Sequence, residues 1–349
     1  MNVIAEAQQS HQPIDPIRLT RQLCEIESTT YHEGKIGDFL ESYLRQIGWQ
    51  VEKTPVPQLE LHDGPRWNIF AAIPGKTPEV VFSTHMDTVP PYIQFSEDEE
   101  FLYGRGVCDA KGILAAQIAA SCRLRESGCN VGVLFVSGEE RDSAGAIAAN
   151  QHPKPVRYLI NGEPTGNRLA LASKGSIRVT LKAHGKMAHS AYPELGDSAI
   201  HKLVRALGRI LDAKWPTDAT AGDTTVNIGQ IQGGHAPNVI ADSAEAELHF
   251  RLVTDSEPVC EKILETVKGL VEVRFGLQID FVRLKAVEGF PTMIAKFTTD
   301  IPKLANWGEP LLIGPGSIHV AHSPGEKISK QDLLHAVELY VQLGQQLLK

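Results

Sequence analysis

The sequence contains few cysteines, and the five that it has are scattered along the chain. None belongs to a C-x-x-C pair, which argues against a cysteine zinc site and indicates a reducing compartment. The first twelve residues lack the basic start and apolar stretch of a secretion signal, and no run of 18 apolar residues occurs. We therefore expect a cytoplasmic protein without a membrane span.

Positive charge is also scarce, because 34 Lys and Arg residues stand against 42 Asp and Glu residues, for a net charge of −8. Such a chain has no overall positive field that would hold nucleic acid or an anionic membrane. Its 349 residues, 42% of them hydrophobic, are enough for one large domain or two of ordinary size. We expect small-molecule partners and no binding to nucleic acid or membranes.

Several catalytic signatures are missing. The sequence has neither the H-E-x-x-H helix of many zinc proteases nor the G-x-S-x-G turn of serine hydrolases. Residues 74–77 (PGKT) lack the first glycine of a P-loop. In residues 104–109 (GRGVCD), an aspartate replaces the third glycine of a dinucleotide fingerprint, so we reject nucleotide binding there.

Strand and helix patterns alternate in the first half of the chain. Apolar residues at helical spacing predict two initial helices, at residues 15–27 and 33–47. The strands that follow are continuously apolar, as strands buried on both faces are. This alternation predicts an α/β layered sheet. The expected strands are 67–72, 80–83, 131–136 and 156–161, and the expected helices are 111–126 and 143–150.

The pattern changes near Ser173, after which apolar and polar residues alternate. The following order is β-α-β-β-α-β, typical of a ferredoxin-like domain. Its expected elements are strand 177–183, helix 198–211, strands 225–231 and 244–252, helix 258–271 and strand 278–284. A last strand at 311–313 and helix at 330–348 are too short for a separate core. We therefore predict one domain from residues 1–174 and 286–349, with a second inserted at 175–285.

A histidine and a carboxylate close one of the buried strands. His85 and Asp87 point to the same side, because residues i and i+2 of a strand share a face. In open α/β sheets, ligands bind at the carboxyl ends of the strands. A histidine oriented by a neighbouring acid suits a metal ligand, although a hydrogen-bonded surface pair is the ordinary alternative.

Three more acids occupy comparable positions. Asp109 lies in a tight turn before the helix at 111–126, where it could equally cap that helix. Glu139 and Glu140 follow the strand at 131–136. Adjacent acids raise each other's pKa unless a cation lies between them or one is protonated. One could therefore bind a metal and the other carry a proton, although a solvated acidic loop is the ordinary alternative.

Two further candidates come from later segments. Glu163 follows the strand at 156–161, and His322 lies in a turn-rich loop, where each alone would be an ordinary surface residue. Together the candidates are two imidazoles and three carboxylates, which suit zinc, cobalt or manganese. Five ligands suit two metals about 3.5–4 Å apart, bridged by one carboxylate and a water. The predicted ligands are His85, Asp109, Glu140, Glu163 and His322.

Seven segments between residues 83 and 326 resemble, in order, a two-zinc amidohydrolase and exopeptidase family. This family contains acetylornithine deacetylase, succinyl-diaminopimelate desuccinylase, glutamate carboxypeptidase and aminoacylase. The resemblance implies a zinc-exopeptidase-like α/β/α catalytic domain with a mixed sheet, and an inserted ferredoxin-like lid domain that forms a homodimer. The segments are STHMDTVP, LYGRGVCDAKG, FVSGEE, NGEPT, GKMAHSAYPELGDSAI, GGHAPNVIADSAEAELHFRL and GPGSIHVAHSPGE.

The resemblance also assigns roles to the candidates in the catalytic domain. Asp87 would orient the neighbouring histidine ligand, and Glu139 would be the general acid and base. The ligands would divide between two metals, with His85 and Glu163 on one, Glu140 and His322 on the other, and Asp109 as the bridge.

Three residues of the lid domain match the family as well. His189 would reach a partner subunit's site and stabilise the oxyanion. Asn238 and Arg251 would hold the substrate carboxylate. The family often has an acid two residues before this arginine, where the present chain has His249.

The implied reaction is hydrolysis of an amide bond in an N-acyl amino acid or a short peptide. The motif at residues 314–326 most resembles acetylornithine deacetylase, which favours deacetylation of an N-acetylornithine type of substrate. A carboxypeptidase, a dipeptidase or a desuccinylase with the same chemistry is the alternative. A metal-binding relative without turnover is disfavoured, because all five ligands and Glu139 are present. We expect two zinc ions, with cobalt and manganese as alternatives.

Overall fold

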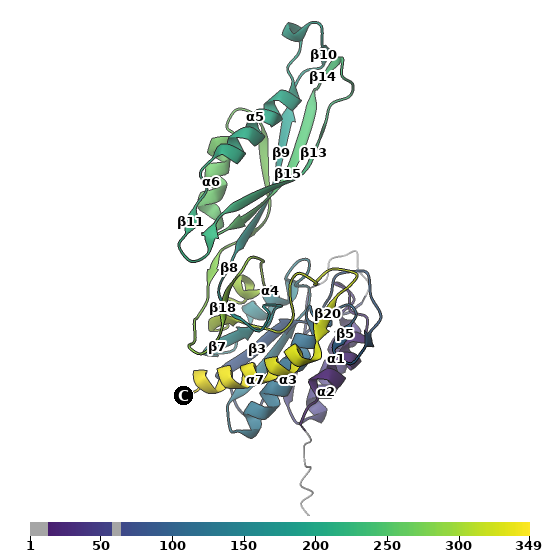
Figure 1. Ribbon diagram of the computed structural model, residues 1–349, viewed down its shortest axis with the longest axis vertical. Coiled ribbons are helices and arrows are strands. Elements are labelled where there is room, and N and C mark those ends of the chain that lie inside the picture. The colour runs from purple at the N-terminus through teal and green to yellow at the C-terminus, as the bar shows by residue number, and fades with distance from the viewer. Residues whose placement is uncertain (1–12, 58–63) are drawn as a thin grey trace, which may run out of the picture. The chain divides into compact units, whose positions relative to one another are not determined.

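A computed structural model describes residues 13–57 and 64–349, which form two compact units (Figure 1). The first unit contains the chain up to Ala170 together with Leu284–Met293 and Lys303–Lys349. The second contains Leu171–Arg283 and Ile294–Pro302. The second unit is thus inserted into the first, and each is described by itself below.

A six-stranded mixed sheet forms the centre of the first unit, in the order β1-β2-β6-β3-β7-β19. β6, β3, β7 and β19 are parallel, β2 is antiparallel to β6, and β1 is antiparallel to β2. The mixed sheet that the family resemblance implied is therefore confirmed. Its strands are β1 (Gln50–Pro55), β2 (Trp67–Ala72), β3 (Val80–His85), β6 (Val131–Val136), β7 (Tyr158–Asn161) and β19 (Glu309–Leu312).

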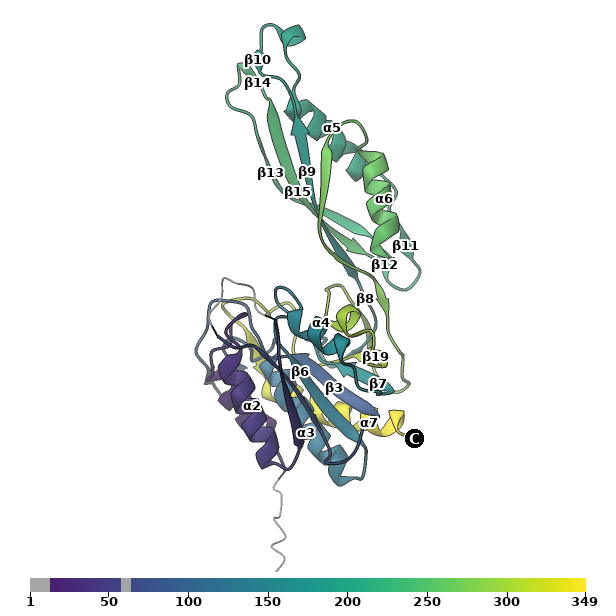
Figure 2. The same cartoon turned by 180° about the vertical axis from the view of Figure 1, so that it is seen from behind.

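Alternate residues of the central strands pack into two different hydrophobic clusters. Phe82 and Phe135 belong to one cluster, and their neighbours Val81 and Leu134 belong to the other. Since successive side chains of a strand point to opposite faces, helices cover both faces of the sheet (Figure 2). On one face lie α1 (Pro16–Cys24), α2 (Gly34–Gln46), α3 (Lys111–Glu126) and α7 (Lys330–Leu347), and on the other lies α4 (Ala144–Gln151).

The described residues also form two small three-stranded sheets, which are separate from the larger sheets. In one of them, β20 of the C-terminal segment pairs with β5, which precedes the turn leading into α3. This pairing brings residues near 326 beside residues near 104. The strands are β4 (Ser96–Glu97), β5 (Phe101–Tyr103) and β20 (Lys327–Ser329) in this sheet, and β8 (Leu169–Ser173), β17 (Val282–Arg283) and β18 (Thr292–Ala295) in the other.

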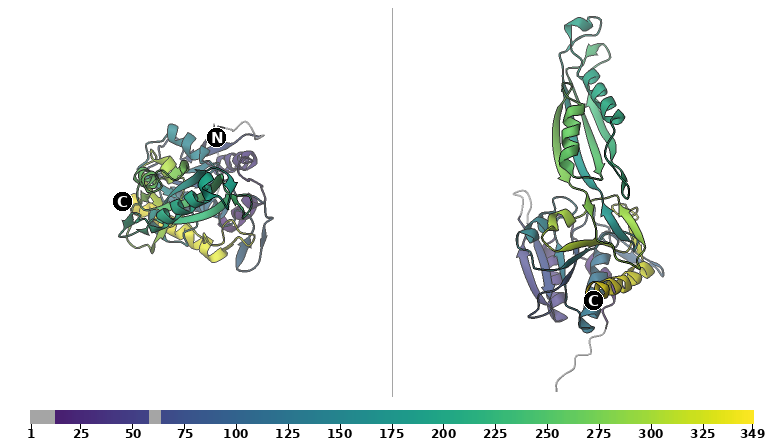
Figure 3. Two further views of the ribbon diagram at one scale, coloured as in Figure 1. Left: turned by 90° about the horizontal axis from the view of Figure 1, so that it is seen from above. Right: turned by 90° about the vertical axis from the view of Figure 1, so that its left-hand side faces the viewer.

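The second unit is a four-stranded antiparallel sheet, in the order β13-β15-β9-β16, with two helices packed on one face (Figure 3). Buried apolar residues alternate along β9 and β15 and meet the helices in one hydrophobic cluster. The predicted β-α-β-β-α-β order is confirmed. The elements are β9 (Gly175–His184), α5 (Ala199–Asp212), β13 (Thr225–Gly233), β15 (Ser243–Leu252), α6 (Ser256–Thr266) and β16 (Glu272–Ile279).

The end of this unit differs from the prediction. The helix predicted at 258–271 ends at Thr266, and the strand predicted at 278–284 runs instead from Glu272 to Ile279. Gly269 has a φ of +77° in the turn between them, a conformation that favours glycine and does not continue a helix. None of the helices in the described residues is long and apolar enough to cross a membrane.

Candidate metal centre

The carboxyl ends of three parallel strands lie side by side at one edge of the six-stranded sheet. In the parallel register, the last residue of β3, His85, lies opposite the last residue of β6, Val136. β7 pairs with the other side of β3. The residues that follow these strands therefore reach the same edge, and they include Asp87, Glu140 and Glu163.

Two histidines contact the carboxylate of Asp109, one at each oxygen. His85 Nε2 lies 3.0 Å from Oδ1 of Asp109, and His322 Nε2 lies 3.3 Å from Oδ2. Glu140 joins this group through His322, whose Nε2 is 2.9 Å from Oε2 of Glu140. One ligand atom each from His85, Asp109 and Glu140 lies within 4.8 Å of the others. A carboxylate whose two oxygens face different imidazoles is placed to be shared by two metal ions, one at each oxygen.

Burial and charge have opposite effects on these groups. Burial lowers the pKa of His85, but hydrogen bonds with Asp109 and Asp87, together with the negative charges of Glu163 and Asp109, outweigh it and raise this pKa overall. Hydrogen bonds with Asp109 and Glu140 raise the pKa of His322 to about 10. The carboxylates thus favour a positive charge between them. A set of imidazole nitrogens and carboxylate oxygens with this demand for positive charge fits divalent metal ions.

Glu163 is buried beside this group. Only 4% of its surface is exposed, and its charge contributes to the raised pKa of His85. A Cβ atom at Gly314 would lie 2.4 Å from the backbone oxygen of Glu163, so the returning segment packs directly on it. The three residues whose ligand atoms fit one metal site do not include Glu163, and its role as a ligand stays a prediction.

Asp87 organises the loop after β6 as well as its own histidine neighbour. Its carboxylate accepts hydrogen bonds from the backbone N–H groups of Gly138 at 2.9 Å, Glu139 at 3.1 Å and Glu140 at 3.3 Å. His85 Nδ1 lies 2.9 Å from the backbone carbonyl oxygen of Asp87 and 3.5 Å from its carboxylate. The backbone of Asp87 therefore makes the shorter contact with the histidine, and its side chain fixes the acidic loop.

A buried arginine that is not among the predicted site residues supports the same loop. The guanidinium of Arg66 lies 3.2 Å from Glu33 and 3.1 Å from Asp142, and it stacks over the ring of Tyr31 at 4.9 Å. A Cβ atom at Gly138 would lie 2.2 Å from Arg66 Nη2. The glycine directly before the two acids is the sequence signal that such close packing leaves.

The three predicted lid residues belong to the second unit. The strand that ends at His189 pairs with Val239, and the backbone carbonyl of Asn238 accepts a hydrogen bond from Ser190, so His189 and Asn238 lie together. Arg251 lies apart from them. It is close to the C-terminal end of β15, whereas Asn238 precedes the N-terminal end of that strand. The structure thus divides these residues between two places within the unit.

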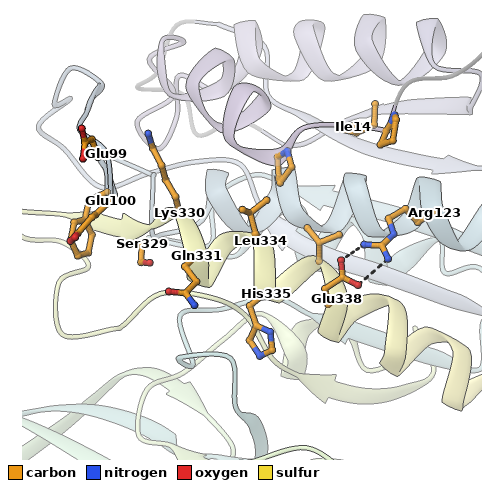
Figure 4. A pocket seen from close by; sticks show the side chains of 14 residues that line it. Ile14, Glu99, Glu100, Arg123, Ser329, Lys330, Gln331, Leu334, His335 and Glu338 are labelled. Carbon is orange, nitrogen blue, oxygen red and sulfur yellow. Dashed lines mark hydrogen bonds and ion pairs between the residues drawn. The ribbon is translucent and has the colours of Figure 1, made fainter.

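A separate cavity of about 910 Å³ lies between α7 and α1 in the first unit (Figure 4). Its lining includes Leu334, Lys330 and His335 on α7 and the ion pair between Arg123 and Glu338. None of the predicted site residues lines it. We therefore assign it no part in catalysis.

Comparison with known proteins agrees with this architecture. The model of the peptidase dimerisation domain of the M20 family matches residues 171–275. A peptidase M20 domain-containing protein from Schizosaccharomyces pombe is 34% identical, over 95% of this chain and 86% of its own length. A probable carboxypeptidase from Paracoccidioides lutzii is 37% identical, over 94% of this chain and 84% of its own length.

Solved structures show the same fold at lower identity. An aminopeptidase PepT from Bacillus cereus superposes with a TM-score of 0.81 at 22% identity, over 97% of this chain and all of its own. A dinuclear metal-binding M20 peptidase from Bacillus subtilis superposes with a TM-score of 0.70 at 17% identity, over 95% of this chain and 97% of its own.

Fold and relatives together define the class of protein as a metallohydrolase with a catalytic α/β/α unit and an inserted dimerisation domain. Within that class, the chain belongs to the M20 peptidase family.

Proposed function

We propose that the protein is a two-metal exopeptidase that hydrolyses the terminal amide bond of a short peptide, in the manner of a carboxypeptidase or dipeptidase. The observation that carries this proposal is the Asp109 carboxylate, which has His85 at one oxygen and His322 at the other. Relatives more than a third identical over nearly the whole chain bear the name probable carboxypeptidase.

The proposed ligands divide between two metal ions that share one carboxylate. Zinc is the proposed metal, and cobalt and manganese suit the same donors. When bound, the two ions would lower the pKa of a water molecule and polarise the scissile carbonyl. His85 and Glu163 would hold one ion, Glu140 and His322 the other, and Asp109 both.

Glu139 is the proposed proton carrier. Its backbone N–H group is held by Asp87, and the side chain belongs to a loop whose next residue is the proposed ligand Glu140. In this role Glu139 takes a proton from the attacking water and returns it to the departing amine. The overall reaction adds one water molecule across the amide bond, giving a carboxylate and a free amine.

The second unit supplies the remaining proposed roles. His189 would stabilise the oxyanion in the site of a second copy of the chain, and Asn238 and Arg251 would hold the substrate carboxylate. These roles require a homodimer formed through the second unit. The match of residues 171–275 to a dimerisation domain supports that assembly.

Deacetylation of an N-acetyl amino acid is the second candidate function. The observation that favours it is the motif at residues 314–326, which resembles that of acetylornithine deacetylase. Both functions use the same water activation and differ in the acyl group that the site admits. A peptidase must accommodate an amino-acid residue on the acyl side, whereas a deacetylase needs room only for a methyl group.

Substrate profiling separates these functions. Zinc-reconstituted protein is assayed with N-acetylornithine, N-succinyl-diaminopimelate and glutamyl-terminated dipeptides and tripeptides. The peptides are offered with a free terminus and with an acetyl or amide block. We expect kcat/KM for at least one peptide to exceed that for every N-acetyl amino acid by more than tenfold. An N-acetylornithine rate that exceeds all peptide rates would replace the proposed function with the second candidate.

The blocked peptides identify the end that is cleaved. A carboxypeptidase tolerates an acetyl group at the N-terminus and is stopped by an amide at the C-terminus, because it recognises the free carboxylate. A dipeptidase is stopped by either block. Loss of cleavage only on N-terminal acetylation would indicate an aminopeptidase and would contradict the proposed carboxylate role of Arg251.

A further inference from the structure

Glu326 is a buried carboxylate that lies between two segments of the metal centre. Its Oε1 accepts hydrogen bonds from three backbone N–H groups of one turn, those of Gly106 at 2.9 Å, Cys108 at 3.1 Å and Asp109 at 3.1 Å. Only 2% of the residue is exposed. It therefore fixes the backbone of the residue whose carboxylate faces both histidines.

The other oxygen of Glu326 binds Arg105. Arg105 Nη1 lies 2.6 Å from Oε2 of Glu326, and this arginine is itself 2% exposed. Arg105 also donates to the backbone oxygens of Pro91 at 3.3 Å and Ser323 at 3.5 Å. The buried pair thus connects the segment after β3, the turn before α3 and the loop that contains His322.

The same contacts explain why the turn depends on a residue so distant in sequence. Gly106 has a φ of +90°, and the N–H groups of Gly106, Cys108 and Asp109 lie in the turn before α3, outside the hydrogen-bond ladder of that helix. Buried N–H groups without an acceptor are strongly disfavoured. Glu326 supplies that acceptor, four residues after His322 and directly before β20.

We infer that Glu326 is a positioning residue that sets the affinity of the centre for its metal ions by holding Asp109 and the His322 loop in register. This inference rests on the proposed metal centre. Asp87 does the same for the loop of Glu139 and Glu140, where it accepts three backbone N–H groups. The buried carboxylates of Glu326 and Asp87, which are not among the proposed ligands, therefore each fix the backbone of a segment that contains a proposed ligand.

The test compares metal binding by wild-type protein and E326Q, whose amide keeps the size of the side chain but gives Arg105 no anion. Metal-free protein is titrated with zinc against a competing fluorescent chelator, and folding is checked by circular dichroism without metal. Loss of a group that orients metal ligands typically costs 10–100-fold in affinity. We expect a loss of that size, together with a lower kcat and an unchanged KM at saturating zinc.

Two further variants complete the design. E338Q removes the charge from an exposed Glu–Arg pair in the cavity that none of the proposed ligands lines, and it should bind zinc as the wild type does. R105K keeps a cation beside Glu326 but loses the planar fork that reaches Pro91 and Ser323. It should weaken zinc binding less than E326Q does, and it carries the test if E326Q does not fold.

Folded E326Q that binds two zinc ions as tightly as the wild type would overturn the inference, as would folded R105K with unchanged affinity if E326Q is unfolded. A purely structural role would lower the thermal stability of metal-free protein and leave zinc affinity unchanged. Wild-type protein that binds no pair of zinc ions would contradict the proposed metal centre itself, which separates the two failures.

Discussion

The carboxylate of Glu140 and the imidazole of His322 lie 2.9 Å apart, although 182 residues separate them in the chain. The contact depends on the C-terminal segment, which returns to the first unit through β19 and β20 after the second unit. His322 has a φ of +61°, an uncommon backbone conformation for a residue other than glycine. Residues held in such conformations cluster at functional sites, as expected if this histidine is a metal ligand.

Replacing His322 with alanine should therefore release one of the two proposed metal ions. The variant loses an imidazole that faces both Glu140 and Asp109, so the second zinc should bind at least 10–100-fold more weakly. Metal content measured by mass spectrometry after dialysis checks this expectation. The matched control is His319→Ala, in the same loop and also exposed. Two tightly held zinc ions in His322→Ala would show that this histidine is not a ligand.

Replacing Glu139 with alanine should leave metal binding intact and remove most of the turnover. Positioned proton transfer contributes about 10²–10⁴-fold to a rate, so kcat should fall by that factor at saturating zinc. The control is Arg141→Ala, an exposed position two residues further along the same loop. A kcat close to that of the wild type in Glu139→Ala would end the assignment of this residue as proton carrier.

Sequence alone predicts the parts of the site that follow from strand periodicity. His85, Asp87 and Glu140 could be placed at one sheet edge because each lies at or just after the end of a buried apolar strand, and parallel strands end together. The presence of helices on both faces of the sheet could also be predicted, because strands that are buried on both faces need a helix layer on each side.

Other parts of the site depend on contacts that local pattern does not encode. Arg66 and Glu33 have the residue types of an exposed surface, and only the fold shows that both are fully buried against each other. Glu326 was part of a recognised motif, yet its function depends on a turn more than 200 residues earlier. The end of α6 was missed because helical spacing continues past Gly269, whose backbone conformation is set by the turn.

Gly138→Ala should be more damaging than the same change at another left-handed glycine. A Cβ atom at Gly138 would lie 2.2 Å from Arg66 Nη2 and 2.4 Å from Asp142 Oδ1, and its φ is +87°. Gly128 has a φ of +83° with nothing within 4 Å. Both substitutions should lower the free energy of unfolding by about 1–2 kcal/mol, because alanine disfavours a left-handed backbone. Gly138→Ala should lower it by about 1–3 kcal/mol more, because its Cβ atom clashes with its neighbours.

Urea unfolding of both glycine variants measures this difference, and peptide hydrolysis measures its effect on the loop. Only Gly138→Ala should lose activity, on the order of 10²-fold, because the displaced loop carries Glu139 and Glu140. Equal losses of stability and activity in the two variants would mean that the contact with Arg66 does not hold the loop.

Glu33 should make the stability of the protein fall as the pH rises from about 4.5 to 7. Burial raises the pKa of Glu33 to about 7, with a further contribution from Asp87 and an opposing one from Arg66. Between these pH values the folded protein keeps a proton that the unfolded chain has released. The contribution of Glu33 to the free energy of unfolding therefore falls by about 3 kcal/mol across this window and is level above it.

Metal-free wild-type protein and Glu33→Gln are compared by urea unfolding at pH 5, 6, 7 and 8. The glutamine has no proton to lose, so its free energy of unfolding should lack this decline, and Glu338→Gln should keep it. The same pH dependence in Glu33→Gln and the wild type would show that another group is responsible.

The proposed dimer can be tested on the outer face of α5. Ile200, Val204 and Leu211 are exposed at helical spacing, with Val204 60% exposed, while the opposite face of the helix packs on the sheet. β13 is an edge strand of that sheet, so its outer backbone groups are available to a second copy.

A carboxylate at the centre of an apolar interface is costly, because it would be buried without a partner. Val204→Glu should therefore give a monomer in analytical ultracentrifugation at concentrations where the wild type is dimeric. Leu264→Glu, at a residue of α6 that is 48% exposed, should stay a dimer. The monomer should also lose hydrolysis while keeping both zinc ions, because His189 would no longer reach a partner's site. A fully active monomer would be compatible with the proposed metal centre, but it would contradict the proposed role of His189 in the site of a second copy.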